Sequence, residues 1–191
     1  MGTFAEFAET CRSVLISPFA FFRRMPVTEG VSRAVYFALI MYYFRCVVYF
    51  IISYRQGYFL IPEIAVNTVS ITFAAIFFAA APFFLLLILY TQAVLLNSIG
   101  VFFGGIGNFE GAFKVLAFTL FISLFILIPG VGYIAHTYAV IVLIIGIHEV
   151  YAVDWISSIL AIFFSYLFTS VLYVILFVPP AFLSKIMFSI Q

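Results

Sequence analysis

Four side chains in two polar stretches are of the chemical types that bind divalent metal ions. Glu110 lies in "GVFFGGIGNFEGAFK" (100–114), and "GIHEVYAVDW" (146–155) contains His148, Glu149 and Asp154. Because carboxylates and imidazole are common metal ligands, one interpretation is a metal-dependent membrane enzyme. The other is that these groups cap helix ends and meet water at the membrane surface. We favour the second, and expect a non-enzymatic protein with no catalytic residue, bound metal or other cofactor.

Known catalytic motifs are incomplete in these stretches. His148-Glu149 begins like the zinc-protease motif HExxH, but the fifth position is occupied by Ala152. The chain contains no GK[ST] sequence, which excludes a P-loop. The motifs therefore identify no known class of enzyme.

The first stretch contains three closely spaced glycines, Gly104, Gly105 and Gly107. They do not fit the dinucleotide-binding pattern GxGxxG, and no predicted strand precedes them. We interpret them as residues that permit a tight turn with positive φ and a close approach of helices. The GxxxG spacing of Gly100 and Gly104 also leaves a homo-oligomer open, although it falls at a loop.

Two polar residues interrupt the long apolar segments. Arg45 lies past the middle of the first segment, and Gln92 lies toward the end of the second. A charge at such depth is costly, so it usually faces protein or water, or reaches toward the lipid headgroups. The main alternative function is therefore a small transporter, channel or lipid-moving protein, with Arg45 and Gln92 on a polar track.

The composition indicates that this chain is an integral membrane protein in contact with the lipid bilayer. Of its 191 residues, 67% are hydrophobic and 8% are charged, and the mean hydropathy is +1.32. Roughly a quarter of the residues of a soluble domain are charged. A net charge of +1 without a basic cluster gives no indication of nucleic-acid binding, and we expect none.

The predicted fold is all-α: a bundle of five transmembrane helices preceded by an amphipathic interfacial helix. Each span needs about 20 apolar residues, and the alternation typical of a membrane barrel is absent. Pro82 lies within the long second segment, which predicts a kink, a tilt or an extension beyond the bilayer. The predicted spans are 31–54, one within 66–99, 111–128, 132–150 and 155–178.

Residues 1–29 are predicted to form an amphipathic segment before the membrane domain, 30–191. Apolar residues recur at three- and four-residue steps through 3–24, and charged residues occupy the other face. Ser17 and Pro18 predict the start of a second helix within the segment. The apolar face can dip into the headgroup layer or pack on the protein's own helices, and we favour the first.

The distribution of lysine and arginine predicts the orientation. A cytoplasmic N-terminus places five of these residues on the cytoplasmic side and two, Arg55 and Lys185, on the other. Five spans then put the C-terminus outside, and both polar stretches on the cytoplasmic side. There we expect a docking face for a protein partner or for lipid headgroups, formed by Gly104, Gly105, Gly107, Glu110, His148, Glu149 and Asp154.

Three stretches together resemble the Ypt-interacting-protein (Yip) family of five-span membrane proteins. The stretch "SPFAFFRRM" (17–25) is similar to the family's Pro-Phe-Phe-Arg entry segment. "FFGGIGNFEGAFKVLAF" (102–118) is similar to its Gly-Gly-x-Gly-x-Phe stretch before the third span. "IPGVGYIAHTYAVIVLIIGIHEVYAVD" (128–154) is similar to its Ile-Pro and Gly-Leu-x-Glu-Val block. The resemblance implies a five-helix membrane fold.

Two departures from the family pattern bear on function. Family members often have His-Gly after Glu-Val, where this chain has Tyr151-Ala152 and carries its histidine at His148 instead. This weakens a catalytic or metal role for the loop. The long polar tail of eukaryotic members is missing, so the resemblance points to the prokaryotic branch and its plasma (inner) membrane.

Eukaryotic relatives are implicated in vesicle trafficking and contact Rab-type GTPases. For this chain the resemblance implies a membrane scaffold or adaptor with a role in membrane organisation, without carrying the trafficking function over unchanged.

Overall fold

The computed structural model describes residues 4–55, 58–59, 61–65, 71–128 and 130–177. Within them, five helical stretches are long and apolar enough to cross a bilayer: Ser32–Ile52, Phe78–Phe102, Phe109–Leu127, Gly132–Tyr151 and Trp155–Leu172. The predicted all-α bundle of five membrane helices is therefore confirmed.

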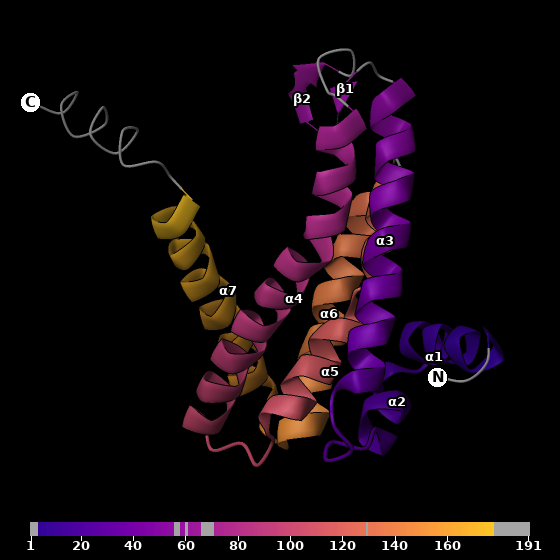
Figure 1. The fold of residues 1–191 in the computed structure, drawn as a ribbon. Helices are drawn as coiled ribbons and strands as arrows, with labels where there is room; N and C mark the ends of the chain where they lie inside the picture. Colours follow the sequence, from indigo (N-terminus) through magenta and orange to yellow (C-terminus); the bar gives the residue numbers. More distant parts are fainter. Residues whose placement is uncertain (1–3, 56–57, 60, 66–70, 129, 178–191) are drawn as a thin grey trace, which may run out of the picture.

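Two short helices precede the bundle, α1 (Phe4–Ile16) and α2 (Pro18–Arg24). As predicted, Ser17 immediately precedes the second helix and Pro18 begins it, because the fixed φ of proline suits the first helical turn. The Ser17 side chain makes no capping hydrogen bond. In Figure 1, α1 lies crosswise beside the first membrane helix.

The first two membrane helices are α3 (Ser32–Arg55) and α4 (Ile71–Phe102). At 1.5 Å per residue the second is about 48 Å long, so it exceeds a hydrocarbon core of about 30 Å, as predicted for this segment. Between them lies an antiparallel pair of short strands, β1 (Tyr58–Phe59) and β2 (Ile61–Ala65). This hairpin was not predicted from the sequence.

The remaining elements are α5 (Phe109–Thr119), the 3₁₀ helix η2 (Ile122–Leu127), α6 (Gly132–Tyr151) and α7 (Trp155–Phe177). The third span thus changes from α to the tighter 3₁₀ geometry on its way across. Every residue of α5 from 111 to 119 is buried. This helix therefore lies in the core, where it packs against α4, α6, α3 and α1, whereas α7 packs on α4 and α6.

The apolar face of α1 and α2 belongs to the same core as the spans. Cys11, Val14 and Phe22 are buried in it. Phe7 packs on Phe37 of α3, with ring centroids 5.1 Å apart. Phe21 packs on Phe118 near the C-terminal end of α5, with ring centroids 5.3 Å apart. Phe19 of the same segment is 43% exposed, so the prediction that phenylalanines dip into lipid stays a prediction for that residue. For Phe7, Phe21 and Phe22 the structure supports the alternative, in which the stripe packs on the protein's own helices.

The connections between the spans gather at two opposite ends of the molecule. Figure 1 shows the β1–β2 hairpin at one end, with the C-terminal end of α3 and the N-terminal end of α4. The opposite end holds the α4–α5 connection, the junction of α6 with α7, and α2. The two polar stretches thus share one end of the bundle.

Candidate functional site

We call the end of the bundle that holds the two polar stretches the polar end. Tyr151, the last residue of α6, lies at the centre of its contacts. It is fully buried, with 0% of its surface exposed. Its hydroxyl donates toward Oδ1 of Asn97 at 2.8 Å and toward the carbonyl oxygen of Asn108 at 3.0 Å. The ring therefore joins the end of α4, the start of α5 and the end of α6.

The glycine-rich connection wraps the ring of Tyr151. A Cβ atom added at Gly107 would come within 2.6 Å of Cδ1 of the ring, and one at Gly105 within 2.9 Å. No side chain larger than hydrogen fits at such distances. The N–H of Ile106 donates to the carbonyl oxygen of Tyr151 at 3.0 Å, which joins the two polar stretches directly. Gly104 is exposed and has a φ of +83°, the left-handed conformation that favours glycine.

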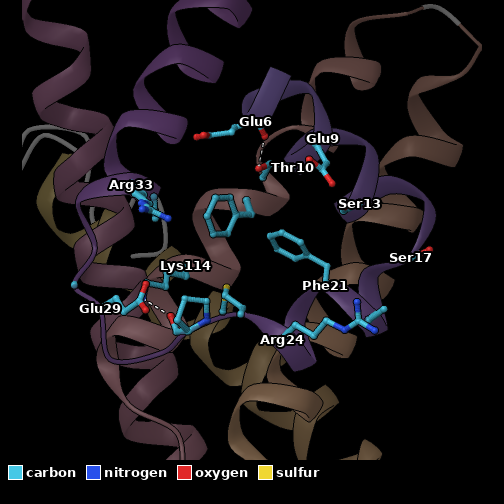
Figure 2. Close-up of a pocket in the computed structure, with 16 residues that line it drawn as sticks. Glu6, Glu9, Thr10, Ser13, Ser17, Phe21, Arg24, Glu29, Arg33 and Lys114 are labelled. Carbon is cyan, nitrogen blue, oxygen red and sulfur yellow. Dashed lines mark hydrogen bonds between the residues drawn. The ribbon is translucent and has the colours of Figure 1, made fainter. Parts of the chain in front are cut away.

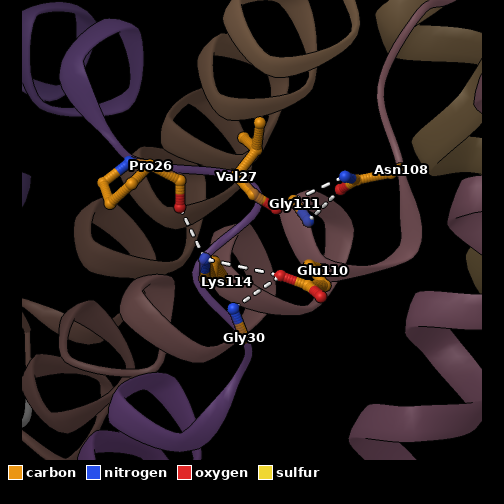
Figure 3. A network of polar contacts seen from close by, with 7 residues as sticks. All are labelled: Pro26, Val27, Gly30, Asn108, Glu110, Gly111 and Lys114. Carbon is orange, nitrogen blue, oxygen red and sulfur yellow. Dashed lines mark hydrogen bonds and ion pairs between the residues drawn. The ribbon is translucent and has the colours of Figure 1, made fainter.

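Asn108 begins α5 and also holds the linker between α2 and α3. Its Oδ1 accepts a hydrogen bond from the N–H of Gly111 at 2.8 Å, a typical N-cap. Its Nδ2 donates to the carbonyl oxygen of Val27 at 3.3 Å (Figure 3). One amide thus serves two chain segments about eighty residues apart.

Glu110 and Lys114 complete the attachment of the same linker. The N–H of Gly30 donates to Oε2 of Glu110 at 2.8 Å, and Nζ of Lys114 donates to the carbonyl oxygen of Pro26 at 2.5 Å. The two side chains also lie 3.9 Å apart, Nζ to Oε2, one helical turn from each other (Figure 3). Glu110 therefore accepts a hydrogen bond from the linker just before α3, while its side chain stays 36% exposed.

Glu149 forms a two-point ion pair with Arg23 of α2. Nε of Arg23 donates to Oε2 at 3.0 Å, and Nη2 donates to Oε1 at 2.9 Å. The Glu149 side chain is 9% exposed and that of Arg23 is 71% exposed. The hydrogen bonds and the Coulomb attraction to Glu149 raise the pKa of Arg23. Glu149, which was predicted to belong to the docking face, thus pairs with a cation of its own chain.

His148 and Asp154 are both used in the turn between α6 and α7. Nδ1 of His148 donates to the carbonyl oxygen of Val153 at 2.6 Å, and its ring stacks on Trp155 with centroids 4.1 Å apart. Oδ2 of Asp154 accepts from the N–H groups of Ile156 at 3.1 Å and Ser157 at 3.3 Å. Asp154 therefore caps the start of α7, as the helix-capping interpretation predicted.

The four side chains considered as metal ligands are directed to separate partners. Glu110 is bonded to Gly30, Glu149 to Arg23, and His148 and Asp154 to the turn that contains them. Across the described residues, no three His, Cys, Asp or Glu side chains are grouped so that they could hold a metal ion. The arrangement is that of structural capping and cross-linking.

Arg45 and Gln92, the two residues of the predicted polar track, have different surroundings. Arg45 is exposed on α3. Gln92 is buried between α4 and α7, where its Nε2 donates to the hydroxyl of Ser165 at 3.0 Å and its Oε1 accepts from Thr169 at 2.6 Å. Neither residue lines the cavity of about 640 Å³ beside α1, α2 and the start of α3, or the cavity of about 450 Å³ between α3 and η2. The amide of Gln92 links two helices.

The sequence analysis missed the roles of Asn108, Arg23 and Tyr151. Asn108 had a local signal, because asparagine directly before an apolar helical run is a common N-cap. Arg23 had none, since its partner is 126 residues away in the chain. Tyr151 was noted as a departure from a family pattern, without the inference that the glycines would pack on its ring.

Comparison with known protein families gives a match over most of the chain. The family model described as the Yip1 domain matches residues 12–178, most of the chain. Searches of curated proteins and of solved structures gave no match. The matched range includes α2, all five spans and both polar stretches, so the elements that build the polar end lie within it.

Proposed function

We propose that this chain, which belongs to the Yip1-domain family, is a non-enzymatic membrane scaffold or adaptor that docks a protein partner on its polar end. The proposed docking face consists of the exposed parts of the α4–α5 connection and of the α6–α7 turn. Membrane organisation is the process to which such a protein would contribute. Assignment to the prokaryotic branch and to a plasma (inner) membrane remains a prediction.

One observation carries this proposal: the polar side chains of the loops are used to hold the loops together. Tyr151, Glu149 and Asp154 each bond to the protein itself. What remains outward is a fixed surface with large apolar side chains, such as Ile106, 84% exposed, and Ile156, 70% exposed. Preorganised loops lose little conformational entropy when a partner binds, which favours docking over chemistry.

We further propose that the polar end is cytoplasmic and that the C-terminus lies outside. This orientation is supported by the positions of Arg23, Arg24 and Lys114 at or near the polar end, since lysine and arginine favour the cytoplasmic side. Lys185, which was counted on the other side, lies outside the described residues.

The transport alternative gains no support from the positions of its two proposed residues. Arg45 is exposed on α3, and the polar atoms of Gln92 are bonded to two hydroxyls of α7. A polar track requires groups that can exchange partners with a passing solute. We therefore retain docking as the proposed function.

Site-specific photo-crosslinking in native membranes tests the docking face. A photoreactive amino acid at Ile106 or Ile156 should give a discrete crosslinked product in the full-length protein. The matched control is Tyr54, which is also exposed but lies at the C-terminal end of α3, at the other end of the bundle from the polar end. The product formed from Ile156 should disappear when Ile106 is changed to Asp, because both residues would contact the same partner.

Two results would contradict the proposal. One is crosslinking of equal yield and identical products from Tyr54 and from Ile156. The other is a product from Ile156 that survives Ile106→Asp unchanged. Labelling of cysteines placed at Gly104 and Tyr54 with an impermeant reagent would decide the orientation independently, since the two positions should be reached from opposite sides.

A further inference from the structure

A half-open cavity lies between α1, α2, the linker to α3, the start of α3 and α5. Its volume is about 640 Å³, which falls within the range of about 300–1,000 Å³ typical of ligand pockets. Three carboxylates and three cations line it, so the cavity carries no net charge: Glu6, Glu9, Glu29, Arg24, Arg33 and Lys114. Figure 2 shows these side chains around the opening.

The charges are partly separated by sign around the cavity. In Figure 2, Glu6 and Glu9 lie along α1 on one side, whereas Arg24, Arg33 and Lys114 lie on the sides across from it. Glu29 lies beside the cations. The cavity therefore presents an acidic wall formed by α1 and a largely basic wall formed by α2, α3 and α5.

The basic wall has capacity for an anion. Within the part of the chain that the structure describes, neither Arg24 nor Arg33 forms an ion pair. Lys114 also lines the cavity, but its Nζ donates to Pro26 and lies 3.9 Å from Oε2 of Glu110, so the two arginines carry most of this capacity. Arginine presents several N–H donors in a planar fork, which matches a phosphate group.

The cavity also has an apolar part and lies near the start of the first span. Phe21 and Phe118 line it, and Phe118 is 8% exposed. Arg33 is the second residue of the stretch, beginning at Ser32, that is long and apolar enough to cross a bilayer, and this would place the cavity at the boundary between the hydrocarbon core and the headgroup layer. A ligand at this level can place an apolar part against the phenylalanines and a polar part among the charges.

We propose that the cavity binds the zwitterionic headgroup of an aminophospholipid of the phosphatidylethanolamine type. The phosphate lies against Arg24 and Arg33, and the primary ammonium faces the carboxylates of α1. Glycerol and the first acyl methylenes cover Phe21 and Phe118. The site is separate from the loop face, so the proposed docking function does not depend on it.

The separation of charge predicts selectivity among lipid headgroups. Phosphatidylcholine carries the same charges, but its trimethylammonium has no N–H to donate to Glu9. Phosphatidylglycerol has the phosphate but no cation, so the acidic wall repels rather than attracts it. Soluble phosphoethanolamine has the same polar groups without the apolar part that Phe21 and Phe118 would bind.

Native mass spectrometry of the purified full-length protein in detergent tests the proposal with these four compounds. We expect phosphatidylethanolamine to bind more tightly than the other two lipids, and free phosphoethanolamine to compete poorly. Arg33→Gln should weaken that binding by about ten-fold or more, as expected for the loss of a charge-assisted hydrogen bond. Glu9→Gln should reduce the preference over phosphatidylcholine.

Matched controls make the result decisive. Arg12→Gln removes an exposed arginine of α1 that does not line the cavity, and it should leave binding unchanged. If Arg33→Gln fails to fold, Arg24→Gln tests the same wall. Equal binding of the three lipids, a preference for phosphatidylglycerol, or an equal effect of Arg12→Gln and Arg33→Gln would overturn the proposal. Competition by free phosphoethanolamine as strong as that of the lipid would instead assign the cavity to a soluble ligand.

Discussion

Arg23 of α2 and Glu149 of α6 are joined by two parallel hydrogen bonds, 3.0 and 2.9 Å long, although 126 residues separate them in the chain. This geometry holds arginine and carboxylate by two atoms each, which fixes their mutual orientation as well as their distance. This ion pair attaches α2, which precedes the first span, to the C-terminal end of α6, which forms the fourth span.

The two halves of this ion pair should respond unequally to substitution. Arg23→Ala leaves a carboxylate that is 9% exposed without its cation, whereas Glu149→Gln leaves an arginine that is largely solvated. Because an unpaired charge costs more where water is excluded, Arg23→Ala should lower the melting temperature in detergent more than Glu149→Gln does. Arg24→Ala is the matched control, and a loss equal to that of Arg23→Ala would refute a specific role for the pair.

Tyr151 and Gly107 should behave as one packing unit. Gly107→Ala brings a methyl group within 2.6 Å of the ring, and such overpacking costs about 1–3 kcal/mol of unfolding free energy. The same substitution should cost less in a Tyr151→Ala background, because the ring is then absent. A double-mutant cycle measured by denaturant or thermal unfolding gives the coupling, and additive effects would argue against the contact.

The hydroxyl of Tyr151 should contribute separately from its ring. Tyr151→Phe keeps the packing but removes the hydrogen bonds to Asn97 and Asn108, for an expected loss of about 1 kcal/mol. Phenylalanine at this position should therefore be tolerated far better than alanine, as measured by the same unfolding assay. Equal losses for the two variants would mean that the ring packing contributes little.

Replacing Ala152 with glycine should stabilise the folded protein. It follows the last residue of α6 as the C-cap, with a φ of +53°, in the left-handed region that costs residues with a Cβ about 1 kcal/mol or more. Ala152→Gly should raise the unfolding free energy by up to about 1 kcal/mol, after allowing for the greater freedom of glycine in the unfolded chain. Ala152→Val should lower it, and a destabilising effect of glycine would contradict this account.

The cap formed by Asp154 should depend on pH. Hydrogen bonds from the side chain and N–H of Ser157, and then from the N–H of Ile156, lower the pKa of Asp154. Its contribution to stability is therefore present above its unfolded pKa of about 4, and it is lost as the pH falls through the lower folded value. Asp154→Ala should have a lower melting temperature than the wild type at neutral pH, and the difference should shrink below about pH 4. Asp154→Asn, which can still cap, provides the control.

Cys11 should react slowly with thiol reagents in the folded protein. Burial raises its pKa to about 11, so at pH 8 only about one thiol in a thousand is ionised. In a Cys46→Ser background, N-ethylmaleimide should modify Cys11 much more slowly before denaturation than after it. Fast labelling of the native protein would indicate that α1 separates from the bundle.

The membrane class and the five spans could be predicted from the sequence because both depend on local quantities. Hydropathy summed over about 20 residues identifies each span wherever the rest of the chain lies. Sequence breaks such as Pro129-Gly130 are local in the same way, because they separate spans wherever the rest of the chain lies. The predicted span ends at 54, 150 and 178 lie within one residue of the helix ends at Arg55, Tyr151 and Phe177. The capping role of Asp154 belongs to the same class, since its partners are two and three residues away.

Tertiary structure alone decided which distant groups meet. The helical periodicity of α1 and α2 identifies an apolar face but not its neighbours, and only the folded structure shows that Phe7 packs on Phe37 and Phe21 on Phe118. Likewise, the charge of Glu149 was evident from the sequence, but its partner Arg23 was not. The hydropathy of a segment depends only on the residues of that segment, so it can be read from the sequence. Ion pairs and side-chain packing depend on distances of a few ångström between segments, and these distances exist only once the chain has folded.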